Sequence, residues 1–146
     1  MKPRASGFTL IELLIVVAII GIIASIAIPN LLNAIDKGKQ KRTMADMRAI
    51  GTAVEAYAIE NALYPTAATA AAIKALIDPT YIKLMPAVDG WSNTFQVDSG
   101  AFAYTIFSHG KDGIGTSCPP GTTTNFNDEI CFVTGQFQRF PSGPQQ

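Results

Sequence analysis

The sequence has few of the residues on which enzyme active sites usually depend. It contains one histidine, His109, and two cysteines, with no C-x-x-C pair and no H-E-x-x-H stretch. It also lacks a glycine-rich phosphate loop with its lysine and a G-x-S-x-G nucleophile turn. A Ser-His pair would have to use Ser108 and His109, and neighbouring residues in a strand point to opposite faces. We therefore expect a protein that is not an enzyme.

The sequence also lacks a net charge, because its 11 basic residues balance its 11 acidic ones. A protein without a global field gives no electrostatic reason to expect a nucleic-acid partner. Basic residues do gather between Ile35 and Arg48, but no aromatic residue lies among them on which bases could stack. We interpret this stretch as a charged face between packed helices and expect no nucleic-acid binding.

The most prominent feature that is present is a long apolar run over residues 8–28, which follows the basic residues Lys2 and Arg4. One interpretation is an ordinary secretory signal, removed at the small residues just before Ile28. The other is a retained membrane helix, because about 21 residues in helical form span roughly 31 Å, the thickness of a bilayer core. An ionised Glu12 inside the run carries an insertion cost of roughly 2.5–3.5 kcal/mol. A disposable signal gains nothing from that residue, which favours the retained helix.

The stretch Gly7-Phe8-Thr9-Leu10-Ile11-Glu12 resembles the class III signal of the type IV pilin and pseudopilin superfamily. The resemblance implies that a prepilin peptidase cuts between Gly7 and Phe8 from the cytoplasmic side, removing residues 1–7 as a leader. It also implies that the peptidase methylates the new amino terminus of Phe8. An α-amino group with an ordinary pKa of about 8 is mostly charged at neutral pH.

That charged amine gives Glu12 a partner, and the resemblance implies that the partner belongs to a neighbouring subunit. Phe8 and Glu12 are four residues apart and share a helix face, so pairing within one chain stays open. A buried carboxylate without a partner is unfavourable, so the intermolecular pair would fix the register of assembly more than it stabilises it. We expect Glu12 to act in filament assembly.

The chain beyond the apolar run predicts an α+β fold. Helical spacing continues through Met47, Ile50, Val54 and Tyr57, which predicts one long helix over residues 8–61 with an apolar face against a head domain. A short helix should follow over residues 67–77, stopped by Asp78-Pro79.

Short stretches between turns then predict a small antiparallel sheet, with strands at residues 95–97, 102–107 and 130–134. This combination of long helix, short helix and sheet is the pilin fold that the resemblance implies. We expect the globular head to cover residues 62–140 and residues 141–146 to form a flexible tail.

Two later regions resemble the major, G-type pseudopilins of type II secretion. The first runs over residues 81–96, and the second joins residues 107–113 with residues 127–130. The second region binds calcium in that family, so the resemblance implies a calcium site. Its ligands would be the acidic side chains and nearby backbone oxygens of Asp112, Asp128, Glu129, Ser108 and Ile114. The simpler interpretation, a plain turn and a solvated loop end, stays open.

Cys118 and Cys131 lie close enough in sequence to close a small loop in a region rich in turn residues. A disulfide between them would require an oxidising compartment and would stabilise the fold by about 3 kcal/mol in the chain-entropy model. The two cysteines flank the second acidic cluster, and the segment between residues 115 and 127 is longer than the family's. The disulfide could therefore replace calcium or act together with it.

The resemblance implies a homo-oligomeric helical filament whose subunits are stored in the inner membrane with a periplasmic head. Its partners would be the prepilin peptidase, an assembly ATPase, a platform protein, and minor pseudopilins or pilins. The favoured function is the periplasmic pseudopilus of type II secretion. The alternatives are a type IV pilin of a cell-surface filament, for adhesion, motility or DNA uptake, and a membrane-tethered monomeric binding domain.

Overall fold

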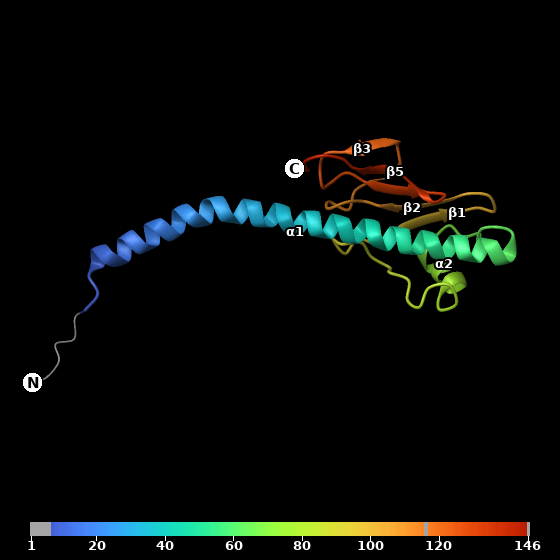
Figure 1. Ribbon diagram of the computed structural model, residues 1–146, viewed down its shortest axis with the longest axis horizontal. Coiled ribbons are helices and arrows are strands. Elements are labelled where there is room, and N and C mark those ends of the chain that lie inside the picture. The colour runs from blue at the N-terminus through green and yellow to red at the C-terminus, as the bar shows by residue number, and fades with distance from the viewer. Residues whose placement is uncertain (1–6, 116, 146) are drawn as a thin grey trace, which may run out of the picture. The chain divides into compact units, whose positions relative to one another are not determined.

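The computed structural model describes residues 7–115 and 117–145 (Figure 1). The chain forms two compact units, and the boundary between them in the sequence lies between Ile35 and Asp36. Helix α1, Leu10–Asn61, runs through both units, and helix α2, Ala70–Ile77, belongs to the second. Five strands complete the second unit: β1 Gln96–Ser99, β2 Tyr104–Ser108, β3 Gly121–Thr123, β4 Ile130–Val133 and β5 Gln136–Pro141. The predicted fold of one long helix, one short helix and a small antiparallel sheet is confirmed, with one pair of strands, β3 and β5, parallel.

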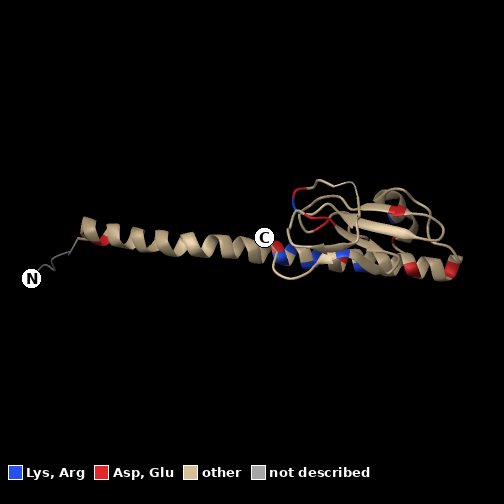
Figure 2. Ribbon diagram, turned by 90° about the horizontal axis from the view of Figure 1, so that it is seen from above, with Lys and Arg blue, Asp and Glu red and all other residues tan. Residues whose placement is uncertain are grey.

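The first unit is the apolar part of α1. Its Leu, Ile and Val side chains are exposed, and the helix is long and apolar enough in this region to cross a membrane. In the sequence, Glu12 is the only charged residue between Phe8 and Ile35, and Figure 2 shows an acidic band near the start of the helix. Side chains of this kind need either lipid or other apolar helices around them.

The second unit has its core where the predicted apolar face of α1 meets α2 and the sheet. Met47, Ile50 and Val54 are fully buried there, and Tyr57 packs against them partly buried. Gly51 lies on the same face, where an added Cβ would collide with the ring of Phe132. The helix and the sheet approach closely at this position, and only a residue without a side chain permits it.

The sheet has the strand order β1-β2-β4-β5-β3 and is antiparallel except for the β5–β3 pair. Strands β3 and β5 were not predicted, since β3 is the short polar stretch Gly-Thr-Thr and half of the residues of β5 are polar. The expected strand at residues 102–107 begins only at Tyr104, because Phe102 lies in the preceding turn with 85% of its surface exposed.

Helix α2 begins at Ala70, later than the expected residue 67, because Thr69 caps it by accepting a hydrogen bond from the Ala72 amide at 3.2 Å. Ala67 instead exchanges backbone hydrogen bonds with Ser99, the last residue of β1. The segment between the two helices is therefore tied to the edge of the sheet.

The segment expected to be a flexible tail, residues 141–146, is partly held to the head. Pro141 ends β5, and Gln145 is buried at 6% exposure. The Gln145 amide donates to the Thr123 carbonyl at 2.7 Å, and its oxygen accepts from Gln40 of α1 at 3.3 Å. A polar side chain with both ends satisfied gives this segment an anchor that its Pro- and Gly-rich composition does not indicate. Residue 146 lies outside the described residues.

Candidate functional site

The start of α1 is built around a reciprocal pair, Thr9 and Glu12. The Glu12 amide donates to the Thr9 hydroxyl at 3.3 Å, and the Thr9 amide donates back to Glu12 Oε2 at 2.8 Å. The Thr9 hydroxyl also donates to the same carboxylate oxygen at 2.6 Å. This arrangement is a capping box, which satisfies amide groups that a helix start leaves unpaired. Sequence reasoning considered only a cationic partner for Glu12, although the T-x-x-E spacing is the usual signal of this cap.

The expected cleavage point lies just before this cap. Gly7 and Phe8 are exposed and not helical, so the peptide bond between them is free of helix hydrogen bonds. A peptidase requires such an extended, accessible segment. The rest of the expected leader, with its basic residues, lies outside the described residues.

The two regions that resemble the G-type pseudopilins meet at Asp89. This carboxylate is buried at 2% exposure and accepts from the Trp91 and Asn93 amides, both at 2.9 Å. Its other oxygen accepts from the Ser108 hydroxyl at 2.6 Å, and Asn93 donates to the Gly110 carbonyl at 2.7 Å. Ser108 is thus paired with Asp89 rather than with His109.

A second carboxylate, Asp36, fastens these loops to α1. Trp91 donates to Asp36 Oδ1 at 3.0 Å and the Lys111 ammonium to Oδ2 at 2.8 Å. Burial raises the pKa of Asp36, but the hydrogen bonds from Lys111 and Trp91 and the charges of Lys111 and Lys39 outweigh it, so the pKa lies below its ordinary value. Gly90 lies against the backbone of Lys39, where a Cβ would collide. The loop around Trp91 therefore docks closely on the helix.

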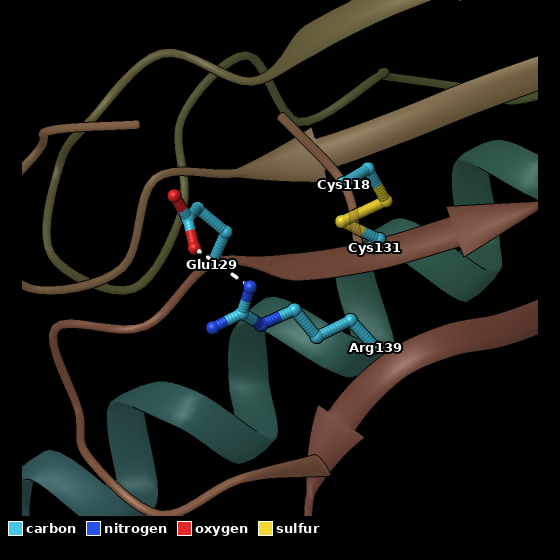
Figure 3. Close-up of a disulfide and its surroundings, with 4 residues drawn as sticks. All are labelled: Cys118, Glu129, Cys131 and Arg139. Atoms are coloured by element: carbon cyan, nitrogen blue, oxygen red, sulfur yellow. Dashed lines mark ion pairs between the residues drawn. A yellow bond between two sulfur atoms is a disulfide. The ribbon is translucent and has the colours of Figure 1, made fainter. Parts of the chain in front are cut away.

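The disulfide between Cys118 and Cys131 is present, as the sequence predicted (Figure 3). It joins the segment before β3 to β4. Strand β5 lies beside β4, and its residue Arg139 is paired in register with Cys131. Figure 3 shows the Arg139 side chain reaching toward Glu129, two residues before the bonded cysteine. The disulfide at Cys131 and the ion pair at Glu129 are thus only two residues apart in the chain.

The residues of the expected calcium site are in different environments. Asp128 and Glu129 form ion pairs with Arg139 at 3.4 and 3.3 Å, whereas Asp112 Oδ1 accepts from the amide of Ile114 in its own turn. Ser108 is directed to Asp89. Within the described parts of the chain, no three His, Cys, Asp or Glu side chains gather closely enough to hold a metal ion. This arrangement of side chains does not support the expected calcium site, and Asp112 caps its own turn through the Ile114 amide.

Arg139, which forms ion pairs with Asp128 and Glu129, was not identified from the sequence. Its only signal in the sequence is the alternation in Gln-Phe-Gln-Arg-Phe-Pro, which places Phe137 and Arg139 on the same, partly buried face of a strand. An arginine on the inner face of a strand near two acidic residues is a reason to expect an ion pair.

The apolar helix with its capped start and the sheet packed on the later part of the same helix place the chain in the pilin class. Comparison with known proteins narrows the class. Residues 2–28 match the prokaryotic N-terminal methylation motif, and residues 30–120 match type II secretion system (T2SS), protein G. The chain belongs to the type II secretion system protein G family.

Several relatives are named type II secretion system core protein G. That of Aeromonas hydrophila is 39% identical over 127 residues, which cover 77% of this chain and 87% of the relative. That of Vibrio cholerae is 37% identical over 124 residues, covering 75% and 83%. That of Pseudomonas aeruginosa is 34% identical over 130 residues, covering 77% and 89%. No solved structure matches the chain. The match to the protein G family ends at residue 120, before the Asp128, Glu129 and Arg139 cluster.

Proposed function

We propose that this protein is the major pseudopilin of a type II secretion system, a structural subunit of a helical filament that drives protein export across the outer membrane. The match of residues 30–120 to the protein G family carries the proposal, and relatives at 34–39% identity have the same name. The apolar first unit of α1 and the match of residues 2–28 to the methylation motif are what such a subunit needs.

The start of α1 suggests how assembly begins. Cleavage between Gly7 and Phe8 by the prepilin peptidase would create a charged amine on Phe8, one residue before the cap residue Thr9 and four residues before Glu12. In a bundle of apolar helices that amine, methylated on Phe8, would compete for the Glu12 carboxylate of a neighbouring subunit. The carboxylate would exchange the amide and hydroxyl of Thr9 for an intermolecular cation, and that exchange fixes the register.

The same proposal defines location and partners. Residues 8–28 would hold the subunit in the inner membrane with its head in the periplasm, until a platform protein and a cytoplasmic ATPase move it into the periplasmic filament. The sequence contains no phosphate-binding motif of its own, so an ATPase would have to supply the energy for extraction. Minor pseudopilins would join the same filament. The oxidised cysteine pair agrees with a periplasmic head.

The first test is the secretome of a deletion strain, compared with the wild type and a complemented strain, with surface filaments counted in the same cultures. We expect exported enzymes to be lost and surface filaments to persist. An unchanged secretome with the filaments gone would contradict the proposal and make the protein a type IV pilin. A strain complemented with a Glu12→Val subunit tests the third alternative, a membrane-tethered binding domain. Such a domain would function normally with this substitution, whereas a pseudopilin or a pilin would not.

A further inference from the structure

We infer that Arg139 is an internal cation that holds Asp128 and Glu129 together, so that the carboxy-terminal loop folds without a divalent metal ion. The inference concerns the stability of the second unit and does not depend on which filament the protein forms. It rests on three observations: the geometry of the ion pairs, the place of Arg139 in the sheet, and the hydrogen bonds that occupy the acidic side chains.

A single guanidinium contacts both carboxylates. One terminal nitrogen of Arg139 lies 3.4 Å from Asp128 Oδ1, and the other lies 3.3 Å from Glu129 Oε2. The side chains of Arg139 and Glu129 are 19% and 17% exposed, so solvent screens this pair less than it screens a surface pair. The planar fork of arginine suits two separate carboxylates, and its charge persists at every ordinary pH.

The sheet fixes Arg139 where this bridge is needed. Arg139 is paired with Cys131 of β4 on one side and with Gly121 of β3 on the other. Its side chain therefore starts from the middle of three adjacent strands. Glu129 in turn lies against Gly115, where any Cβ would come within 2.5 Å of its carboxylate. The bridge thus connects β5 to the beginning of β4 and, through Glu129, to the chain that leaves the Asp112 turn.

The acidic side chains are already satisfied by the protein. Besides its pair with Arg139, Asp128 accepts from the Thr124 and Asn125 amides with Oδ2, at 3.3 and 3.2 Å. Asp112 is occupied by the Ile114 amide at 3.0 Å. A calcium ion needs six to eight oxygen ligands, and to bind Asp128 Oδ1 and Glu129 Oε2 it would have to displace the guanidinium of Arg139. The positive charge that the acidic cluster requires is supplied by the chain.

The test uses the full-length oxidised protein in detergent micelles and follows thermal unfolding by the fluorescence of Trp91, the only tryptophan. We expect the same midpoint with excess chelator as with millimolar calcium. We expect Arg139→Gln to lower the midpoint by about 4–8 °C in both conditions, since the two acidic side chains then lie together unpaired. Arg139→Lys should restore part of the loss. Arg42→Gln is the control, because the Arg42 side chain is 68% exposed and contacts a single carboxylate, Asp46 of the next helical turn.

A triple variant, Asp128→Asn with Glu129→Gln and Arg139→Gln, distinguishes charge neutralisation from packing. If Arg139 acts by neutralising the acidic pair, removing all three charges should leave the protein more stable than Arg139→Gln alone. A lower midpoint of the wild type in chelator would overturn the inference, and that measurement needs no variant. An Arg139→Gln midpoint equal to that of the wild type would overturn it as well.

Discussion

The hydroxyl of Ser108 donates a 2.6 Å hydrogen bond to Asp89, and both side chains are buried. Ser108 ends β2, and Asp89 lies in the long segment between α2 and β1, so the bond joins two regions that are far apart in the sequence. Asp89 also accepts two amides of its own loop. One carboxylate therefore shapes the loop around Trp91 and fastens it to the sheet.

Asp89→Ala should lower the free energy of unfolding by about 1–3 kcal/mol, because it leaves buried donors without an acceptor. Chemical denaturation of the full-length protein in detergent, followed by Trp91 fluorescence, measures the change. Asp98→Ala removes an exposed carboxylate of β1 and should have little effect. Equal effects of the two substitutions would contradict the central role given to Asp89.

Asp36 should make stability depend on acid pH. Its pKa is lowered in the folded protein, so its contribution to stability is complete above the ordinary Asp pKa of about 3.9 and is lost as the pH falls through the lower folded value. Wild type should therefore exceed Asp36→Asn in stability at neutral pH, and the difference should shrink below about pH 4. Lys111→Met, which removes the cation paired with Asp36, should follow the same pH course. A difference that does not change with pH would show that Asp36 contributes through packing alone.

Removal of the disulfide should lower the free energy of unfolding by about 3 kcal/mol in the chain-entropy model. Cys118→Ser with Cys131→Ser, compared with the chemically reduced wild type, measures this contribution in the full-length protein. Both should still fold, because Arg139 and the sheet pairing of β4 with β5 persist without the covalent bond. Loss of the native Trp91 fluorescence in both at room temperature would show that the disulfide is indispensable.

Glu12→Val should be cleaved after Gly7 yet fail to enter filaments or enter them slowly, because the subunit amine finds no carboxylate. Mass spectrometry of the mature chain reports cleavage, and crosslinking between subunits in cells reports assembly. Thr9→Val is the matched control: it removes the hydroxyl from the capping box but keeps the carboxylate, so assembly should persist. Normal assembly of Glu12→Val would refute the assigned role.

The sequence predicted those parts of the fold that depend on local patterns. The apolar spacing through Met47, Ile50 and Val54 identified the buried face of α1, and the helix ends at Asn61 as expected. Among the described strands, β3 pairs only with β5, as its parallel neighbour at the edge of the sheet, and that pairing leaves no periodic apolar signal in Gly-Thr-Thr. The anchoring of Gln145 to Thr123 and Gln40 is likewise a contact between distant segments.

Only part of the candidate site was predicted, because the sequence shows local patterns but not contacts between distant segments. The resemblance to the G-type pseudopilins indicated Asp128 and Glu129, and the short spacing of Cys118 and Cys131 in a turn-rich region indicated the disulfide. The charge that faces the acidic residues comes from Arg139, which reaches them across a strand pairing that local patterns did not reveal. Acidic side chains that lie close together in a sequence predict a nearby positive charge, but the sequence does not show which residue or ion supplies it.

The capping box formed by Thr9 and Glu12 affects when Glu12 could pair with the amine of another subunit. The amide and hydroxyl of Thr9 are attached to the same helix as Glu12, so they are available to it however few subunits the membrane holds. An amine from another subunit becomes a competitor only when subunits are crowded together and their leaders have been removed. Under the proposed assembly, Thr9 would therefore occupy the Glu12 carboxylate until processed subunits are gathered by the filament machinery.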